Sequence, residues 1–303
     1  MTLIAHKKGA NVMKKNKQLC KKAVAILMVM LMAVTTVDTT VFAEETPVTK
    51  TTEDYYFYLM VDPGETAQGF VLEPTCIKIP AGTDTSKKLG EIICNNLLAR
   101  LILVSCQGSY GYISGIRCAE AYDYQISDST YSMYSSLPEV AFHEKIVKKM
   151  NKLTKVLGEY NFTGYSGWMF TLNNEMSTQY NGSSYWYTMG TTVQELMDMN
   201  LLNEDETPVV EMFFTMNMGA DVGLGDAYLP TAVTYYESAD KYVYDWSGDI
   251  NYVAGYEKAD RTELVMALAD NKDDEDYAGS LAVLKDIDAS EEDVEDAVYQ
   301  VSN

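Results

Sequence analysis

Hydrophobic residues follow two different spacings along this chain, and the spacing changes at recognisable turn residues. Alternating or continuous runs of aromatic and β-branched residues predict strands. They occur at 54–62, 70–80, about 102–106, 111–119, 165–174 and 208–217. The first two runs are separated by PGETAQG, which supplies turn residues and predicts a hairpin.

Apolar residues three and four positions apart predict helices. This spacing occurs at 87–101, 138–157 and 191–201, and in three short segments near the C-terminus, at 259–270, 277–287 and 290–301. Ser86 is the expected N-cap of the first helix, and Thr191 or Thr192 that of the third. Ser290 and Asp293 have the spacing of a capping box for the last.

The order of these elements predicts an α+β fold. Two strands, a helix and further strands form one apolar layer, which indicates a sheet with its helices on one face. We expect a polar linker at 44–53, a sheet domain at 54–228, a tyrosine-rich bridge at 229–258 and a small α-helical C-terminal module at 259–303.

Residues 1–43 have the organisation of an export signal. Lysines precede the apolar run AVAILMVMLMAV, and the small residues Val41 and Ala43 stand where a signal peptidase reads the chain. We expect cleavage after Ala43, so that the mature protein is secreted and either extracellular or associated with the cell surface. The run is short for a membrane-spanning helix, and an uncleaved anchor is the alternative.

Charge narrows the choice of partners. The chain has 23 Lys and Arg against 44 Asp and Glu. The signal region contains seven of the lysines and one aspartate, so 16 basic and 43 acidic residues remain, a net charge near −27. Such a surface repels nucleic acid and anionic lipid. We expect no nucleic-acid partner and no membrane insertion after signal cleavage.

Four cysteines remain in the mature chain: Cys76, Cys94, Cys106 and Cys118. An even number in an exported protein predicts two disulfides, whose connectivity the sequence leaves open among three pairings. The pairing of Cys106 with Cys118 across a hairpin near Gly108–Gly111 is weakly preferred. A zinc site is not expected, because no Cys-x-x-Cys pair exists.

The mature chain has one histidine, His143, and it lies within the predicted helix 138–157. It shares an apolar stripe with Ile146, Met150 and Leu153, which indicates packing rather than catalysis. Hydrolases that use an imidazole base need a histidine held by a carboxylate. We therefore predict no catalytic residues, no metal site and no enzymatic activity.

The segments YSGWMFTLNN, VVEMFFTMN and GADVGLG follow the opening strands YYFYLMVD and FVLEPTCIKIP in that order. Over residues 55–225 this pattern resembles the transcobalamin-like C-terminal domain of exported bacterial proteins. The resemblance implies a β-grasp-like mixed sheet. In transcobalamins and intrinsic factor, a domain of this kind closes over cobalamin against a helical barrel, so the resemblance implies cobalamin as a candidate ligand; no other cofactor is expected.

The most specific pieces of the resemblance are SGWM at 166–169 and GADVG at 219–223. They give the candidate ligand-binding residues Ser166, Gly167, Trp168, Met169, Gly219, Ala220, Asp221 and Gly223. A glycine beside Trp168 lets the backbone approach a flat partner, and an indole offers an apolar face with one N–H donor, which suits a corrin, a sugar or a peptide. The alternative is that Trp168 and Phe170 fill the core. The glycine loop lacks the dinucleotide-binding order and predicts a turn at positive φ.

The closing stretch VLKDIDASEEDVEDAVYQV resembles the end of a FIVAR-type helical repeat, a module of Gram-positive surface proteins that serves as a spacer or attachment unit. The acidic run DNKDDED precedes it. An EF-hand loop requires glycine where this run has Glu275. We interpret the run as a solvated loop between helices.

Two hypotheses of different class follow. The first is a secreted or cell-surface binding protein that holds a corrinoid, another small molecule or a glycan through the Trp168 strand and the glycine loop. The second is a structural or adhesive surface module with no small ligand, which a cell-surface partner would contact.

Overall fold

The computed structural model describes residues 48–67, 69–107, 111–117, 155–176, 188–202, 207–230, 232–236, 241–248 and 251–302. These ranges lie within one compact unit, Val48–Asn303. The predicted export signal and its cleavage site lie outside the described residues. Within these ranges, no helix combines the length and the apolar character needed to cross a membrane.

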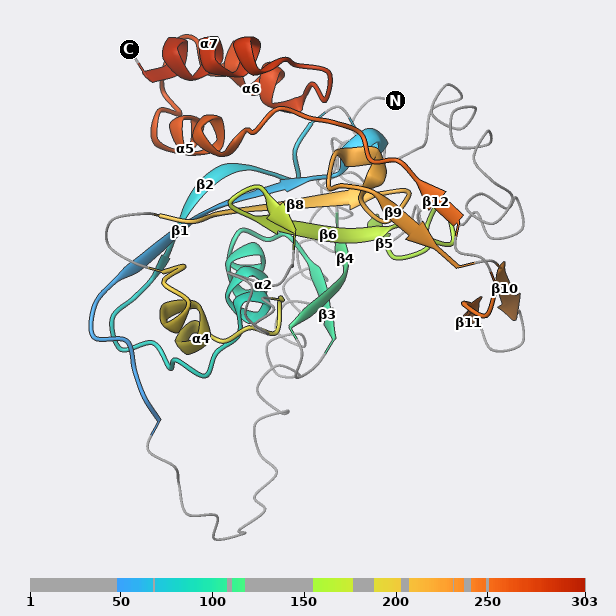
Figure 1. The fold of residues 1–303 in the computed structure, drawn as a ribbon. Coiled ribbons are helices and arrows are strands. Elements are labelled where there is room, and N and C mark those ends of the chain that lie inside the picture. The colour runs from blue at the N-terminus through green and yellow to red at the C-terminus, as the bar shows by residue number, and fades with distance from the viewer. Residues whose placement is uncertain are drawn as a thin grey trace, which may run out of the picture. The chain divides into compact units, whose positions relative to one another are not determined.

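Most of the unit consists of strands, with α2 and α4 between them, and three consecutive helices follow at its C-terminal end (Figure 1). The helices are α2 (Leu89–Ala99), α4 (Val193–Asp198), α5 (Thr262–Asp270), α6 (Tyr277–Lys285) and α7 (Glu291–Ser302), with single turns η1 (Gly64–Thr66) and η4 (Ala220–Val222). The strands are β1 (Tyr55–Asp62), β2 (Leu72–Ile79), β3 (Val104–Gln107), β4 (Tyr112–Arg117), β5 (Val156–Gly158), β6 (Gly167–Leu172), β7 (Glu175–Met176), β8 (Val209–Thr215), β9 (Ala227–Leu229), β10 (Ala232–Tyr236), β11 (Lys241–Asp245) and β12 (Asn251–Val253).

The main sheet has five strands in the order β2-β1-β8-β6-β7. The two central strands, β1 and β8, are parallel, and the other neighbours are antiparallel. The hairpin predicted for the first two strands is confirmed, since Tyr55 of β1 lies opposite Ile79 of β2. The α+β class with a mixed sheet is therefore confirmed.

Helices cover both faces of this sheet: α2 and α4 of the sheet domain pack on one face, and the C-terminal helices cover the other. Phe57 and Leu59 of β1 join α2 in one core. Met60 of the same strand and Phe213 of β8 join α5, α6 and α7 in a second core. Every residue of β8 is buried for this reason, because a strand covered on both faces has no solvent-facing positions. The three C-terminal helices thus share a core with the sheet.

The first predicted helix, α2, begins later than expected. Its N-cap is Lys88, whose backbone N–H is bound by Glu91 at 3.1 Å. Ser86, the expected cap, is held in the preceding turn, where its N–H and its hydroxyl both donate to Asp84. Ser86 therefore stabilises this local turn with Asp84 and is not used to cap the helix. For α4, Thr192 is the N-cap, as one of the two predicted alternatives had it.

A separate three-stranded sheet has the order β3-β4-β5. β3 and β4 pair with one another, which confirms the hairpin predicted for the strands near 102–106 and 111–119. The last two residues of the second predicted strand, Cys118 and Ala119, lie outside the described residues. The predicted helix 138–157 is wrong at its end, because Val156 and Leu157 belong to strand β5. Leu157 is fully buried opposite Ile116, and a long-range strand pairing has overridden the local helical spacing. The rest of that helix, with His143, lies outside the described residues.

The disulfide joins Cys94 of α2 to Cys106 of β3. The weak preference for Cys106 with Cys118 is therefore wrong. In the β3–β4 register, Cys106 lies opposite Ile113, and α2 supplies its sulfur partner. Cys76 has no disulfide partner among the described residues and is exposed.

The three predicted C-terminal helices are confirmed as α5, α6 and α7. The capping box is present, since Ser290 accepts from the Asp293 N–H at 3.2 Å and Asp293 accepts from the Ser290 N–H at 2.9 Å. The run 270–276 connects α5 to α6, as interpreted from the sequence. Among the described residues, no group of three or more His, Cys, Asp or Glu side chains is placed to hold a metal ion.

The segment expected as a bridge contains strands. β10 and β11 form an antiparallel ladder, and β12 pairs with β9. Figure 1 shows β10 and β11 apart from the main sheet. The tyrosines at alternate positions of β11, Tyr242 and Tyr244, are the strand signal that the sequence reading passed over.

Candidate functional site

The two sequence motifs meet at one end of the main sheet. Gly167 of β6 lies opposite Thr215 of β8, and Trp168 lies opposite Phe214. Beyond β8, the chain turns back so closely that a Cβ on Gly219 would lie 3.4 Å from the Met169 sulfur. The structure therefore brings the two groups of candidate residues together.

Trp168 is a core residue. Its indole N–H donates to the Leu157 carbonyl at 2.9 Å, and its ring meets Phe214 edge-on with centroids 5.4 Å apart. The side chain is 6% exposed. Both the donor and the faces of the indole are thus occupied by the protein, and Trp168 presents no open platform to a ligand.

The polar groups of the motifs hold the local backbone. The Asp221 carboxylate accepts from the Thr215 hydroxyl, from the Met216 N–H at 2.7 Å and from the Asn217 N–H at 3.1 Å. The predicted turn is confirmed by the positive φ of 96° at Gly219 and 73° at Gly223. Buried Ser166 acts similarly, since its hydroxyl donates to the Thr163 carbonyl at 3.0 Å.

A tyrosine cluster lies directly beside this meeting point. Tyr165 packs with Ala220 of η4 in a small apolar core that Tyr244 of β11 also contacts. The Tyr244 ring lies 6.0 Å from Tyr165 and 6.3 Å from Tyr160, centroid to centroid. Its hydroxyl donates to the Gly164 carbonyl at 2.7 Å. Burial raises the pKa of Tyr165 and of Tyr244 well above the usual range, so both are neutral hydroxyls.

Large aromatic side chains are exposed on the strands around this cluster. Tyr236 ends β10, Trp246 follows β11, and Tyr252 lies in β12; they are 51%, 53% and 57% exposed. The Tyr252 hydroxyl donates to Asp226 at 3.0 Å, which fixes its ring without covering it. The sequence analysis did not select these residues, although the density of tyrosine and tryptophan in the bridge was visible.

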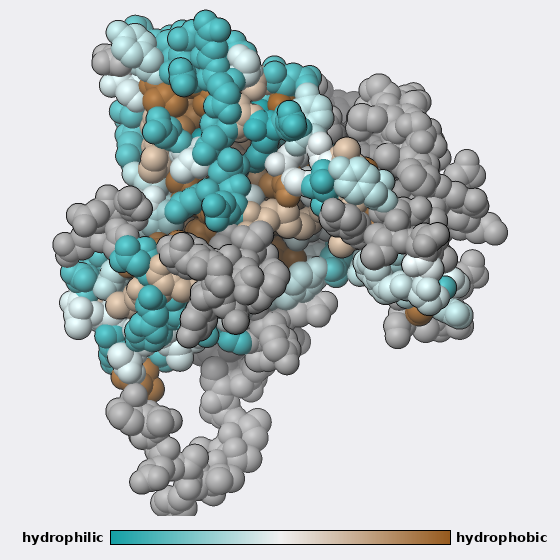
Figure 2. Space-filling model, in the orientation of Figure 1, coloured by the Kyte–Doolittle hydropathy of each residue, from teal (hydrophilic) through white to brown (hydrophobic). Residues whose placement is uncertain are grey.

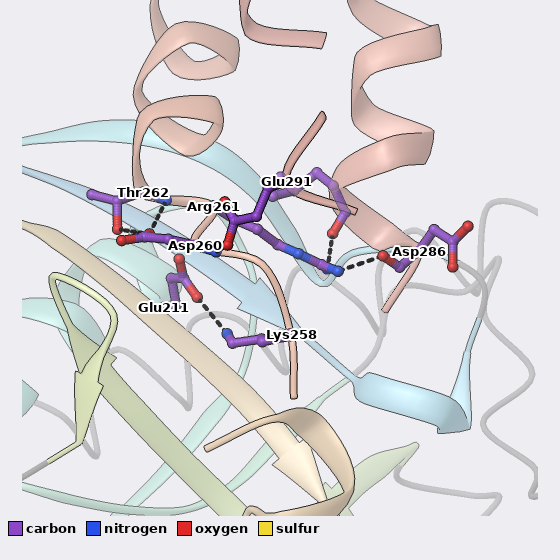
Figure 3. Close-up of polar contacts among 8 residues, drawn as sticks. Glu211, Lys258, Asp260, Arg261, Thr262, Asp286 and Glu291 are labelled. Atoms are coloured by element: carbon purple, nitrogen blue, oxygen red, sulfur yellow. Dashed lines mark hydrogen bonds and ion pairs between the residues drawn. The ribbon is translucent and has the colours of Figure 1, made fainter. Parts of the chain in front are cut away.

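A second group of polar residues is buried between the main sheet and the C-terminal segment, which we define as residues 256–302 (Figure 3). The Lys258 ammonium lies 3.2 Å from Glu211 of β8, and the side chains are 3% and 0% exposed. The ammonium also lies 4.3 Å from the centre of the Phe213 ring. Gly223 makes this crossing possible, because a Cβ there would lie 2.5 Å from the Lys258 Cγ.

The other cations of the C-terminal segment also bind inward. Arg261 donates to the Leu284 carbonyl at 2.8 Å and to the Asp286 carbonyl, beyond the end of α6. Lys285 pairs with Asp62 of β1, and Lys272 donates to the Thr75 hydroxyl at 3.0 Å. Burial lowers the pKa of Arg261.

The outer surface of the segment is correspondingly acidic. On α7 the exposed acids are Glu291, Glu292, Asp293, Glu295 and Asp296. Figure 2 shows hydrophilic surface over much of the C-terminal helices. Three lysines fasten the segment to the main sheet, whereas Arg261 binds carbonyl groups within the segment itself. The exposed acids of α7 face water.

A shallow pocket of about 300 Å³ lies between residues 256–259, which precede α5, and residues 287–291, which lead from α6 into α7. Its polar groups already serve internal contacts, since the Tyr256 hydroxyl donates to Asp288 and Glu291 accepts from the Asp260 N–H at 3.3 Å. Lys258 lines the pocket, but its ammonium is committed to Glu211. The pocket therefore belongs to the attachment of the C-terminal segment.

Comparisons of this chain with protein-family models, with curated proteins and with solved structures find no match. The functional argument therefore depends on the chain's own geometry.

Proposed function

We propose that this chain is an exported binding domain with a β-grasp-like sheet, related to the transcobalamin-like C-terminal family, and that its ligand is a neutral carbohydrate. The strand order supports the fold, because a β-grasp sheet places its first and last strands in parallel at the centre with a hairpin on each side, as β1 and β8 lie here. The meeting of the two motifs across β6 and β8 supports the family. The helical tail stays a proposed FIVAR-like unit.

The observation that supports this ligand is the presence of three exposed aromatic side chains, Tyr236, Trp246 and Tyr252, on the segment that follows the glycine loop. Tyr236 and Trp246 lie toward opposite ends of the β10–β11 ladder, so they offer separate contacts to a chain of sugar rings. Aromatic rings bind the apolar faces of sugar rings, while hydroxyls and carboxylates such as Asp226 and Asp245 accept their hydrogen bonds. A strongly acidic protein disfavours anionic ligands. A corrinoid is the competing ligand, since it is also large and flat.

Calorimetric titration tests the proposal. The wild-type protein is titrated with chitotetraose, cellotetraose, cobalamin and cobinamide. We expect saturable binding of an oligosaccharide, and we expect Trp246→Ala and Tyr252→Ala each to weaken it about tenfold or more, because truncating an aromatic anchor costs above about 1 kcal/mol. Tyr299→Ala on α7 is the matched control, since that tyrosine is 70% exposed and lies in another element. If only cobalamin or cobinamide bound, the ligand would be a corrinoid and not a carbohydrate. If none of the four probes bound, the proposal would be rejected.

Export is tested separately. Mass spectrometry of protein from culture medium should find an N-terminus at Glu44 and an oxidised Cys94–Cys106 pair. Recovery of the intact chain from cytosol with reduced cysteines would contradict export.

The acidic outer face of α7 favours a second candidate, a structural or adhesive surface module without a small ligand. In that case calorimetry gives no heat with any of the four probes, and the protein still binds to intact cells in a salt-sensitive manner.

A further inference from the structure

The Tyr165 hydroxyl is a buried polar group that the fold does not satisfy. Tyr165 is 6% exposed, and its hydroxyl has no hydrogen-bond partner among the residues that the structure describes. It lies in an apolar setting with Ala220, Ala227 and Leu229. A buried hydroxyl without a partner destabilises the folded state, and phenylalanine would fill the same space without that penalty.

The side chain that lies against Tyr165 comes from the β10–β11 hairpin. Tyr244 of β11 contacts the Tyr165 ring and donates to the Gly164 carbonyl, the residue just before Tyr165. The hairpin strands pair with one another rather than with the main sheet. A displacement of Tyr244 would break its hydrogen bond to Gly164 and its ring contacts with Tyr160 and Tyr165, and it would free the Gly164 carbonyl and open the side of the Tyr165 ring that Tyr244 covers.

We infer that the Tyr165 hydroxyl is the buried hydrogen-bonding group of the carbohydrate site, and that the Tyr244 side chain covers it until a sugar displaces that side chain. This inference rests on the proposed function and names the contact on which binding depends. A sugar hydroxyl accepts from or donates to Tyr165, and a second one donates to the Gly164 carbonyl that Tyr244 releases. Glu159, in the turn just before Tyr160, interacts electrostatically with Tyr244, so an anionic sugar is disfavoured.

Tyr165→Phe tests the inference with two readouts of opposite sign. The substitution keeps the ring and removes the hydroxyl alone. We expect the Kd for the oligosaccharide probe, chitotetraose or cellotetraose, to rise about tenfold. We also expect the urea midpoint of unfolding to rise, because the unsatisfied hydroxyl is gone. A tyrosine with a purely structural role would not weaken binding while stabilising the fold.

Tyr244→Phe is the companion variant. It removes the bond to Gly164, so we expect faster amide exchange in β10 and β11 and faster association of the oligosaccharide. Tyr299→Phe, on the distant helix α7, should change none of these quantities.

The outcomes separate the two proposals. An unchanged Kd in Tyr165→Phe with wild-type binding intact overturns this inference alone. A lower urea midpoint in Tyr165→Phe also overturns it, because the hydroxyl would then have a partner in the folded protein. Absence of oligosaccharide binding by the wild type rejects the proposed function together with this site.

Discussion

Lys258 reaches its ion-pair partner Glu211 across 47 residues of sequence and in almost complete isolation from water. The pair links the C-terminal segment to the centre of the main sheet. One carboxylate oxygen of Glu211 has no hydrogen-bond partner among the described residues, so Lys258 is the direct partner of this buried acid, and the Arg261 charge adds a longer-range attraction. A buried pair of this kind contributes little relative to an apolar pair, but removing one partner leaves a buried charge.

Lys258→Met should therefore lower the free energy of unfolding by about 3 to 5 kcal/mol. Adding Glu211→Leu to Lys258→Met should restore most of the loss, because an apolar pair needs no compensation. Urea denaturation of the single and double variants measures both effects. If the double variant were as unstable as Lys258→Met, the unpaired Glu211 charge would not be the cause of the lost stability.

Gly223→Ala tests whether the close contact of the Lys258 side chain with the glycine loop 219–225 contributes to stability. The substitution places a Cβ 2.5 Å from the Lys258 Cγ and at a φ of 73°, so we expect a loss above about 2 kcal/mol. Gly225→Ala is the matched control, because its φ is 97° but nothing lies within 4 Å of the added atom. It should cost about 1 kcal/mol. Equal losses in thermal or urea unfolding would show that backbone conformation alone accounts for both.

The Cys94–Cys106 disulfide should stabilise the folded protein by closing a loop of 12 residues. The chain-entropy relation gives about 3 kcal/mol for a loop of this length. We expect Cys94→Ser to lower the free energy of unfolding by about that amount and to abolish the linked peptide in a non-reducing digest. A digest that instead linked Cys106 to Cys118 would show that the pairing described here is incorrect.

Helix α7 should lose its N-terminal cap in acid. Hydrogen bonds from the Ser290 hydroxyl and N–H lower the pKa of Asp293 below its ordinary value. A lowered pKa means that the cap stabilises the folded state above about pH 4, the ordinary aspartate range, and that this contribution disappears as the pH falls through the lowered value. An NMR titration of the Asp293 carboxyl measures this pKa. In Ser290→Ala it should rise toward the ordinary range; an unchanged value would mean that the serine does not cause the shift.

Local signals predicted the elements that depend on neighbours in sequence. The opening hairpin, helix α4 with its Thr192 cap and the Ser290–Asp293 capping box were all correct, because each is decided within a few residues. The helix expected to reach residue 157 failed at its end, where Leu157 gains a fully buried place opposite Ile116. No local rule contains that long-range gain.

The candidate site divides in the same way. The sequence selected Trp168 and Asp221 correctly as members of one region, but it did not show that the indole N–H and the carboxylate are used within the fold. The exposed side chains next to them, Trp246 and Tyr252, lie in a segment that the sequence analysis treated as a connection. Exposure depends on which neighbours cover a side chain, and those neighbours come from distant parts of the chain.

By itself the sequence determined the α+β class, the positions of most strands and helices, and the acidic charge, because spacing and composition act locally or over the whole chain without reference to contacts. Only the tertiary structure decided which faces of the sheet the helices cover, that Cys94 pairs with Cys106, and that Lys258 meets Glu211. Each of these is a contact between residues well separated along the chain. Its free energy comes from burial and pairing that exist only after the elements have packed.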